Sequence, residues 1–127
     1  VVTVLRNVLP MIGDLARKMG IDACLASVRD IHTPVLELTD KNILRERLLG
    51  EMEKAVELDG AEAVVLGCTG MMGLARGLAE ALAKKGKPAP VVDPTAAAIG
   101  YLELLIRSGL SQSRLAYMKP PEKERRM

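Results

Sequence analysis

The chain has 127 residues, of which 49% are hydrophobic and 27% charged, the size and composition of one globular domain with a substantial core. No run approaches the roughly 18 apolar residues of a membrane span, and no charged segment followed by an apolar one resembles a secretory signal, so we expect a cytoplasmic protein. The formal charge of +2 resides in the last nine residues, so the rest of the chain has no basic stripe that could bind nucleic acid. The only aromatic residues are two tyrosines, too few to stack against bases.

Strand-like and helix-like segments alternate four times along the chain. Residues 1–5 are apolar and β-branched and predict a first strand; a helix follows, with Asn7 as a candidate N-cap and Pro10 in its first turn. Gly20 ends this helix, whose apolar stripe consists of Met11, Ile12, Leu15, Ala16 and Met19. Residues 21–28 predict a second strand.

The later elements follow the same alternation. A loop containing His32 leads to a long helix over residues 40–58, capped by Thr39 or Asp40. Residues 63–67 predict a third strand, followed by a helix that ends near Gly86, and residues 89–92 predict a fourth strand. Asp93 and Pro94 then begin the last helix, as an N-cap followed by a proline in the first turn.

Strands that are apolar on both faces and separated by helices indicate an α/β fold: a four-stranded parallel sheet with helices on both faces, of flavodoxin-like type. We expect this domain to cover residues 1–110 and a carboxyl-terminal tail to cover residues 111–127. In such a sheet the ligand crevice lies outside the carboxyl ends of the strands. A small-molecule substrate would therefore bind there.

Cys68 is the first candidate for chemistry at that edge. It follows the third strand directly, and we expect its sulfur to face the free N–H groups that open the next helix, which would favour a thiolate. Gly67 would remove bulk beside the sulfur, and Gly70 would let a substrate approach the helix start. The alternative is an ordinary turn, with Cys68 as a small buried residue and Thr69 as a helix cap.

Cys24 and His32 are the other residues considered for chemistry. Cys24 falls about four residues before the end of the second strand, more than about 10 Å below the sheet edge, and we expect a buried residue there. Both cysteines are expected to be reduced thiols. His32, the single histidine, has no partner at metal-ligand spacing, so no metal site is predicted; it is either an exposed polar residue or a crevice residue that could meet Cys68.

At these residues the chain resembles a known family. The segments 64–71 (VVLGCTGM) and 90–100 (PVVDPTAAAIG) closely resemble the second half of the hydantoin and allantoin racemases, within the aspartate/glutamate racemase superfamily. The likeness extends to 1–12 (VVTVLRNVLPMI), 24–38 (CLASVRDIHTPVLEL) and 111–124 (SQSRLAYMKPPEKE). The G-C-T-G segment is fairly specific to the superfamily but not to a substrate.

The resemblance implies racemisation without a cofactor by two cysteines. One thiolate removes the proton beside a carbonyl, and the other thiol returns a proton to the opposite face. Cys68 resembles the second cysteine of that pair. Thr69 and Gly70 would then contact the substrate, Thr3 and Arg6 would line the same crevice, and Asp93 stands where the family has a polar residue.

The family has two similar halves, and the half with the first cysteine has no counterpart here. We therefore expect an incomplete enzyme, preceded by further residues, whose exposed apolar surface favours a homo-oligomer. Other functions stay open: an aspartate or glutamate racemase, a maleate isomerase, a single-cysteine decarboxylase of arylmalonate type, or a non-catalytic flavodoxin-like binding domain.

Overall fold

The strands of the structure, a computed structural model that describes residues 1–34 and 40–121, are short and parallel. β1 (Val2–Thr3) pairs with β2 (Arg29–Asp30), and β3 (Val64–Val65) pairs with β4 (Val91–Val92). A single parallel bridge between Val2 and Leu66 joins the two ladders, so the strands follow the order β2, β1, β3, β4. The predicted parallel pairing is confirmed, but it forms two two-stranded sheets rather than one regular four-stranded sheet.

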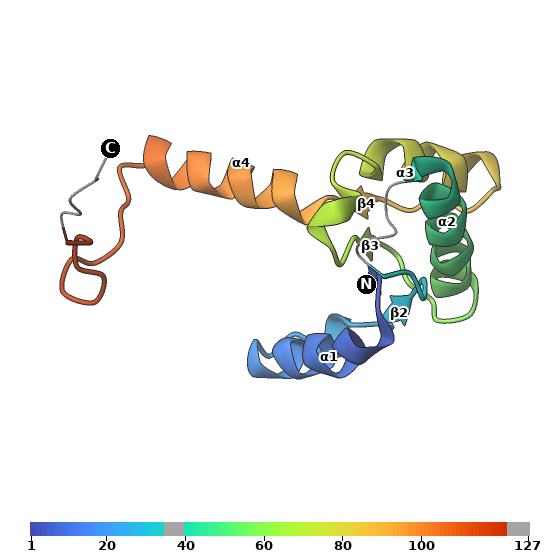
Figure 1. Cartoon of the computed structure of the whole chain (residues 1–127), viewed down its shortest axis with the longest axis horizontal. Helices are drawn as coiled ribbons and strands as arrows, with labels where there is room; N and C mark the ends of the chain where they lie inside the picture. Colours follow the sequence, from blue (N-terminus) through green and yellow to red (C-terminus); the bar gives the residue numbers. More distant parts are fainter. Residues whose placement is uncertain (35–39, 122–127) are drawn as a thin grey trace, which may run out of the picture. The chain divides into compact units, whose positions relative to one another are not determined.

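The helices are α1 (Leu9–Lys18), α2 (Lys41–Glu57), α3 (Ala75–Lys84) and α4 (Pro94–Arg107). Short 3-10 turns stand between them: η1 (Arg6–Val8), η2 (Asp22–Cys24) and η4 (Thr69–Met71). The chain divides into two units, Val1–Ala97 and Ala98–Met127. All four strands and the first three helices belong to the first unit (Figure 1).

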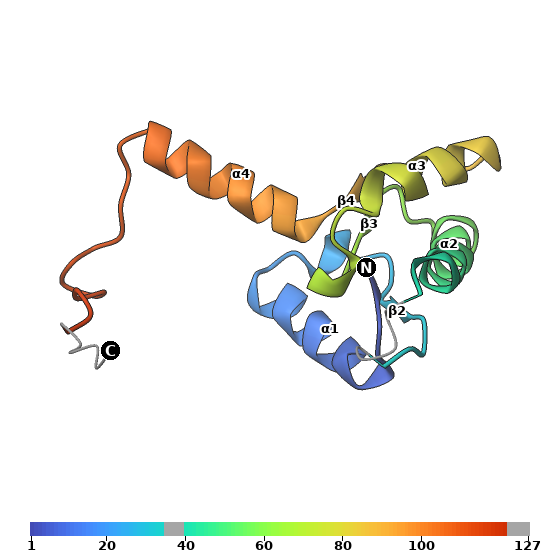
Figure 2. The ribbon, with the colours of Figure 1, turned by 45° about the horizontal axis from the view of Figure 1, so that its top comes forward.

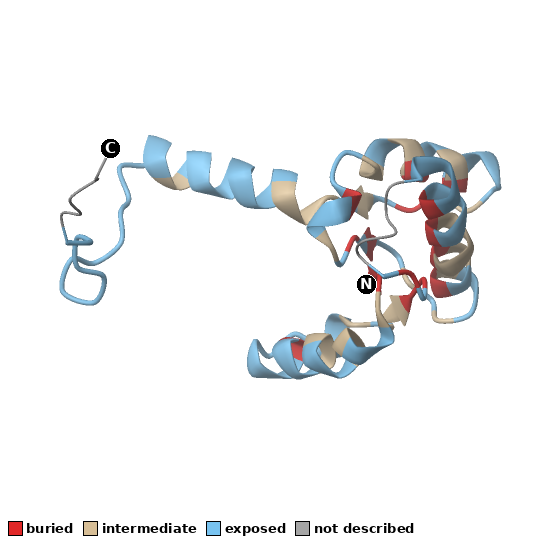
Figure 3. Cartoon of the chain, viewed as in Figure 1, coloured by how far each residue is buried: buried red, intermediate tan, exposed pale blue. Residues whose placement is uncertain are grey.

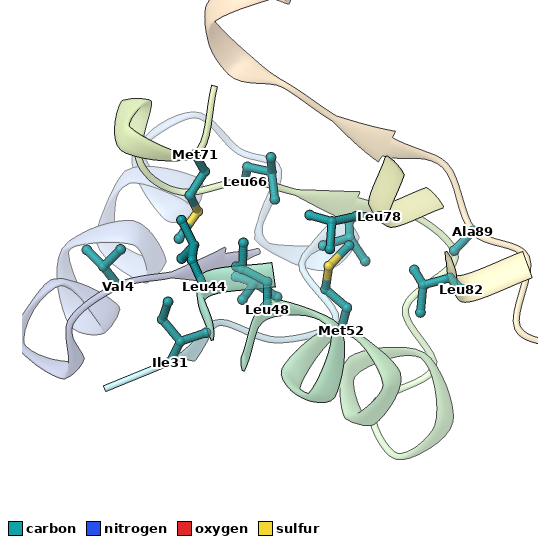
Figure 4. Packing of buried hydrophobic residues seen from close by; sticks show 12 residues of the cluster. Val4, Ile31, Leu44, Leu48, Met52, Leu66, Met71, Leu78, Leu82 and Ala89 are labelled. Atoms are coloured by element: carbon teal, nitrogen blue, oxygen red, sulfur yellow. The ribbon is translucent and has the colours of Figure 1, made fainter. Parts of the chain in front are cut away.

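The core of the first unit lies between the strands and the helices α2 and α3 (Figure 4). Asp40 caps α2, because its Oδ1 accepts hydrogen bonds from the N–H groups of Asn42 and Ile43 at 2.9 and 3.2 Å. The buried face of α2 then repeats at helical spacing through Leu44, Leu48, Met52 and Ala55. Thr39, the other predicted cap, lies outside the described residues, as do residues 122–127 of the basic tail.

The strand predicted over residues 21–28 is wrong. These residues form η2 and an extended segment, and regular pairing starts only at Arg29, which lies opposite Val2. This register leaves residues 21–28 without a partner in β1, since β1 begins at the second residue of the chain. Among these residues, Ser27 alone is held by the start of the chain: the Val1 ammonium donates to the Ser27 carbonyl oxygen at 2.8 Å.

The prediction that Cys24 is buried is wrong for the same reason. Cys24 ends the turn η2, where its N–H donates to the carbonyl of Ile21 at 3.0 Å, and its side chain is exposed. A residue in this local turn is not drawn into the sheet, and its thiol therefore faces outward.

The apolar stripe of α1 forms as predicted, but it is left largely uncovered. Ala16 is the single buried residue of α1, whereas Met11 and Leu15 are 66% and 55% exposed. Figures 1 and 2 both show α1 apart from α2 and α3, and Figure 3 shows how little of it is buried. Asn7 does not cap this helix, because η1 intervenes and Val8 occupies the N-cap position.

The second unit begins within α4, which has no buried residue. Its apolar side chains are exposed, among them Ile99, Leu102, Leu104 and Ile106. Across residues 1–34 and 40–121, no helix combines the length and the apolar character needed to cross a bilayer.

Candidate active site around Cys68

Cys68 lies one residue beyond the close contact between β3 and β1. Its backbone is extended, with φ −148° and ψ 137°, and its side chain is half-buried. The helix predicted after the third strand does not begin directly at Cys68. The three-residue turn η4 comes first, and α3 begins only at Ala75. The N–H of Met71 donates to the carbonyl of Cys68 at 3.1 Å, so the turn closes on itself rather than presenting a long helix start to the sulfur.

Gly67 is required by the neighbouring strand. Its N–H donates to the carbonyl of Val2 at 2.7 Å, and its carbonyl accepts a hydrogen bond from Thr3 Oγ1 at 3.3 Å. A Cβ atom at position 67 would lie 2.7 Å from Thr3 Cβ and 3.2 Å from Thr3 Cα. The absent side chain therefore makes room for Thr3.

Thr3 and Cys68 line one hollow of about 640 Å³. Most of its other walls are apolar side chains that follow β1 or project from α1: Val4, Leu5, Val8, Met11, Ile12 and Leu15. Charge enters the lining through Asp14 and Lys18. Such a hollow can hold a ligand with an apolar substituent against a thiol and a buried hydroxyl group.

The other predicted contact residues are placed elsewhere. Thr69 and Gly70 belong to η4 but not to the described lining of this hollow. Arg6 is exposed at the start of η1 and lines a separate polar hollow of about 400 Å³, together with His32. His32 Nδ1 lies 2.7 Å from Oδ2 of the buried Asp30, and the imidazole is otherwise exposed. The structure thus joins Thr3 with Cys68 and does not bring Arg6 or His32 into their hollow.

An ion-pair network in the wall of the polar hollow was not predicted from the sequence. Arg29 donates from Nε and Nη2 to both carboxylate oxygens of Asp59, at 2.5 and 2.8 Å, and from Nη1 to Glu51 at 3.2 Å. The Arg29 hydrogen bonds lower the pKa of Asp59 to about 2. Since 30 residues separate Arg29 from Asp59, no local sequence pattern marks the pair.

Asp93 caps α4 as predicted and also reaches the turn that carries Cys68. Its Oδ1 accepts the N–H groups of Thr95 and Ala96 at 2.9 and 3.3 Å, and its Oδ2 accepts the N–H of Gly73 at 2.8 Å. The Gly73 hydrogen bond is the main cause that lowers the pKa of this carboxyl group, with smaller contributions from Ala96 and Thr95. The contact with Gly73 could not be read from the sequence.

Within residues 1–34 and 40–121, no group of three His, Cys, Asp or Glu side chains is arranged to hold a metal ion.

Comparisons with known proteins agree on one family. The family model described as Asp/Glu/Hydantoin racemase matches residues 1–102. Hydantoin racemases from Paenarthrobacter aurescens and Rhizobium meliloti are 36% and 39% identical to the chain, over 98% and 91% of its length, but only over 51% and 46% of their own. The chain therefore spans about half the length of the curated relatives it matches.

Solved structures give the same picture. The allantoin racemase from Pseudomonas fluorescens is 35% identical, with a TM-score of 0.79 over 99% of this chain and 52% of that chain. The allantoin racemase from Klebsiella pneumoniae is 33% identical, with a TM-score of 0.81 over 97% of this chain and 49% of that chain. The α/β fold of the chain is thus similar to half of an allantoin racemase.

Proposed function

The chain belongs to the Asp/Glu/Hydantoin racemase family, and from this premise we propose that it is one half of a cofactor-independent racemase of 5-substituted hydantoins or of allantoin. Cys68 would act as one of two thiols on opposite faces of the substrate. Each thiol would take or return the proton at the carbon beside the carbonyl, depending on the enantiomer bound.

One observation carries this proposal: Cys68 opens into an apolar hollow that also contains the Thr3 hydroxyl group. An apolar, water-poor wall strengthens electrostatic stabilisation of the enolate that forms when the proton leaves. Thr69 and Gly70 would contact the substrate carbonyl or ring nitrogen from η4. Arg6 would reach the substrate only from outside the hollow.

The second thiol would come from outside this chain. Cys24 is exposed and lines a different hollow, of about 690 Å³, which does not include Cys68. About half the length of the relatives has no counterpart here, which is room for a second half with its own cysteine.

A single thiol should still perform half of the reaction. In D₂O the isolated chain would exchange the proton of the one enantiomer that faces Cys68, without inverting the centre, because no opposed thiol returns a deuteron to the other face. A chain joined to the remaining half of a hydantoin racemase, which we call the extended chain, would both exchange and racemise. Polarimetry follows inversion, and mass spectrometry of the recovered hydantoin follows exchange.

Matched thiol variants make this test specific. In the extended chain we expect Cys68→Ser to reduce racemisation by about 10² to 10⁴-fold and Cys24→Ser to leave it unchanged. Racemisation by the 127 residues alone, or full activity of the Cys68→Ser protein, would contradict the proposal.

A single-cysteine decarboxylase of arylmalonate type is the second candidate. It is favoured by the one thiol in the Cys68 hollow and by its apolar walls, which would suit an aryl group. Release of carbon dioxide from an arylmalonate, in place of loss of optical rotation from a hydantoin, distinguishes it from the racemase.

We also propose that the isolated chain self-associates through α1. The helix carries an apolar stripe of which Met11, Leu15 and Met19 are each more than half exposed. These side chains border the hollows of Cys68 and Cys24, so a partner surface would cover apolar area close to the site.

A further inference from the structure

The segment between β3 and α3, residues 66–74, which we call the Cys68 loop, is held to the rest of the first unit at three places. At its start, the N–H of Gly67 donates to the carbonyl of Val2 at 2.7 Å. In its middle, the Met71 side chain is fully buried and points toward Leu44 (Figure 4). At its end, the N–H of Gly73 donates to Asp93 Oδ2 at 2.8 Å.

The third of these contacts is the only one made by a polar side chain from outside the loop. Asp93 is 20 residues away in sequence and lies directly after β4, so its carboxylate ties the loop to the end of another strand. Within the loop, the N–H of Met72 donates to Thr69 and that of Leu74 to Met71, at 3.1 and 3.2 Å. The N–H of Met71 donates in turn to Cys68, so hydrogen-bonded turns connect the two neighbours of Gly73 with Thr69 and Cys68.

Helix capping does not account for this contact. Oδ1 of Asp93 makes both capping bonds of α4, and Oδ2 is the atom that accepts from Gly73. Asp40 caps α2 with the same pair of bonds, both accepted by its Oδ1. The two aspartates thus offer the same cap, and the bond to Gly73 is additional at Asp93.

We propose that Asp93 is a positioning residue, whose bond to the N–H of Gly73 fixes the Cys68 loop and thereby the place of the Cys68 sulfur at the rim of its hollow. The catalytic meaning of this placement rests on the proposed function of Cys68, whereas the anchoring itself does not. The ionised carboxylate is the form that serves, because both of its oxygens act as acceptors.

Two variants separate the anchor from the cap. Asp93→Ser keeps a good capping residue but is too short to reach Gly73 as well, and Asp93→Asn keeps one acceptor oxygen in place of two. Asp40→Ser is the matched control, since it makes the same exchange at the cap of α2. All are made in the Cys24→Ser background, where Cys68 is the single thiol.

Hydrogen exchange of the Gly73 amide and alkylation of Cys68 by iodoacetamide are the two readouts. In Asp93→Ser, we expect amide exchange at Gly73 to accelerate about tenfold, the scale of losing one charge-assisted hydrogen bond, and Cys68 alkylation to accelerate with it. Asp93→Asn should fall between this variant and the parent. Asp40→Ser should match the parent in both measurements, and amides in the middle of α2 should be unchanged throughout.

Equal rates in Asp93→Ser and the parent would overturn the proposal, and so would equal acceleration in Asp93→Ser and Asp40→Ser. If Asp93→Ser does not fold, the Asp93→Asn protein decides between the same outcomes. Neither readout requires turnover. A failure of the extended chain to racemise hydantoins would therefore refute the proposed function and leave the anchoring result standing.

Discussion

At the scale of single residues, the site is shaped by how closely two strands approach each other. Thr3 is almost completely buried, and its Cβ occupies the space where a side chain at position 67 would have to be. The atoms on the Thr3 side are a Cβ and a Cα, which cannot move aside as the end of a flexible side chain could. The distance between β1 and β3 therefore depends on the glycine that precedes Cys68.

We predict that Gly67→Ala destabilises the chain by about 1 to 3 kcal/mol, because the added methyl group overpacks the contact with Thr3. Gly50→Ala is the control: a Cβ at this position in α2 meets no atom within 4 Å, and replacing a helical glycine should stabilise the chain by about 0.4 to 1 kcal/mol. Urea unfolding measures both. A Gly67→Ala protein as stable as the parent would show that the strands can separate freely.

The sequence located Cys68 and Thr3 at one strand edge, because the order of strands and the period of apolar residues suffice for that. It could not give the reason for Gly67, which is a contact across 64 residues, or the second bond of Asp93, which spans 20. The capping role of Asp93 can be recognised from the residues that follow it. Its bond to Gly73 depends on which distant segment of the fold lies beside it.

At the scale of elements, ion pairs connect β2 to α2 and to the loop that follows α2. Arg29 follows the extended segment that replaced the predicted strand, and its guanidinium pairs with Glu51 on α2 and with Asp59 beyond it. This pairing adds side-chain contacts to a strand that has only two residues in its ladder.

The Arg29–Asp59 pair predicts a defined acid sensitivity. Because the pKa of Asp59 is about 2 in the folded chain against 3.8 ordinarily, its contribution to stability is complete above about pH 4 and is lost as the pH falls through 2. The difference in unfolding free energy between the parent and Asp59→Asn should therefore shrink between pH 4 and pH 2. The exposed pair of Asp14 with Arg17 serves as a control, and Asp14→Asn should differ little from the parent at any of these pH values.

Denaturant unfolding at pH 5, 3.5 and 2.5 would measure these differences. A gap between the parent and Asp59→Asn that stayed constant from pH 5 to pH 2.5 would contradict the assignment.

The helices were more predictable than the strands. Over residues 41–57 the apolar period, the capping aspartate and the terminal glycine agree, and the structure follows them. Residues 21–28 are equally apolar, but a strand also needs a partner strand in register. The pairing with β1 begins only at Arg29. Local sequence contains the first kind of information and lacks the second.

At the scale of the whole molecule, α1 has more apolar surface than the first unit covers. If the proposed self-association uses this surface, Leu15→Glu in the 127-residue chain should weaken it by about tenfold or more, because one leucine side chain is then no longer buried. Leu58→Glu is the control, since Leu58 is 73% exposed at the end of α2 and does not belong to the stripe. Sedimentation equilibrium distinguishes them, and equal association of both variants with the parent would rule out α1 as the interface.

The charged amino group of Val1 lies in a partly buried position directly before β1. The Val1 ammonium is partly buried and donates to Ser27, and burial lowers its pKa against the opposing pull of Asp59. A charged group thus occupies a position where an uncharged peptide N–H could make the same bond to the same carbonyl at a smaller desolvation cost. Acylation of Val1 would remove that charge and leave one N–H to donate to the carbonyl of Ser27.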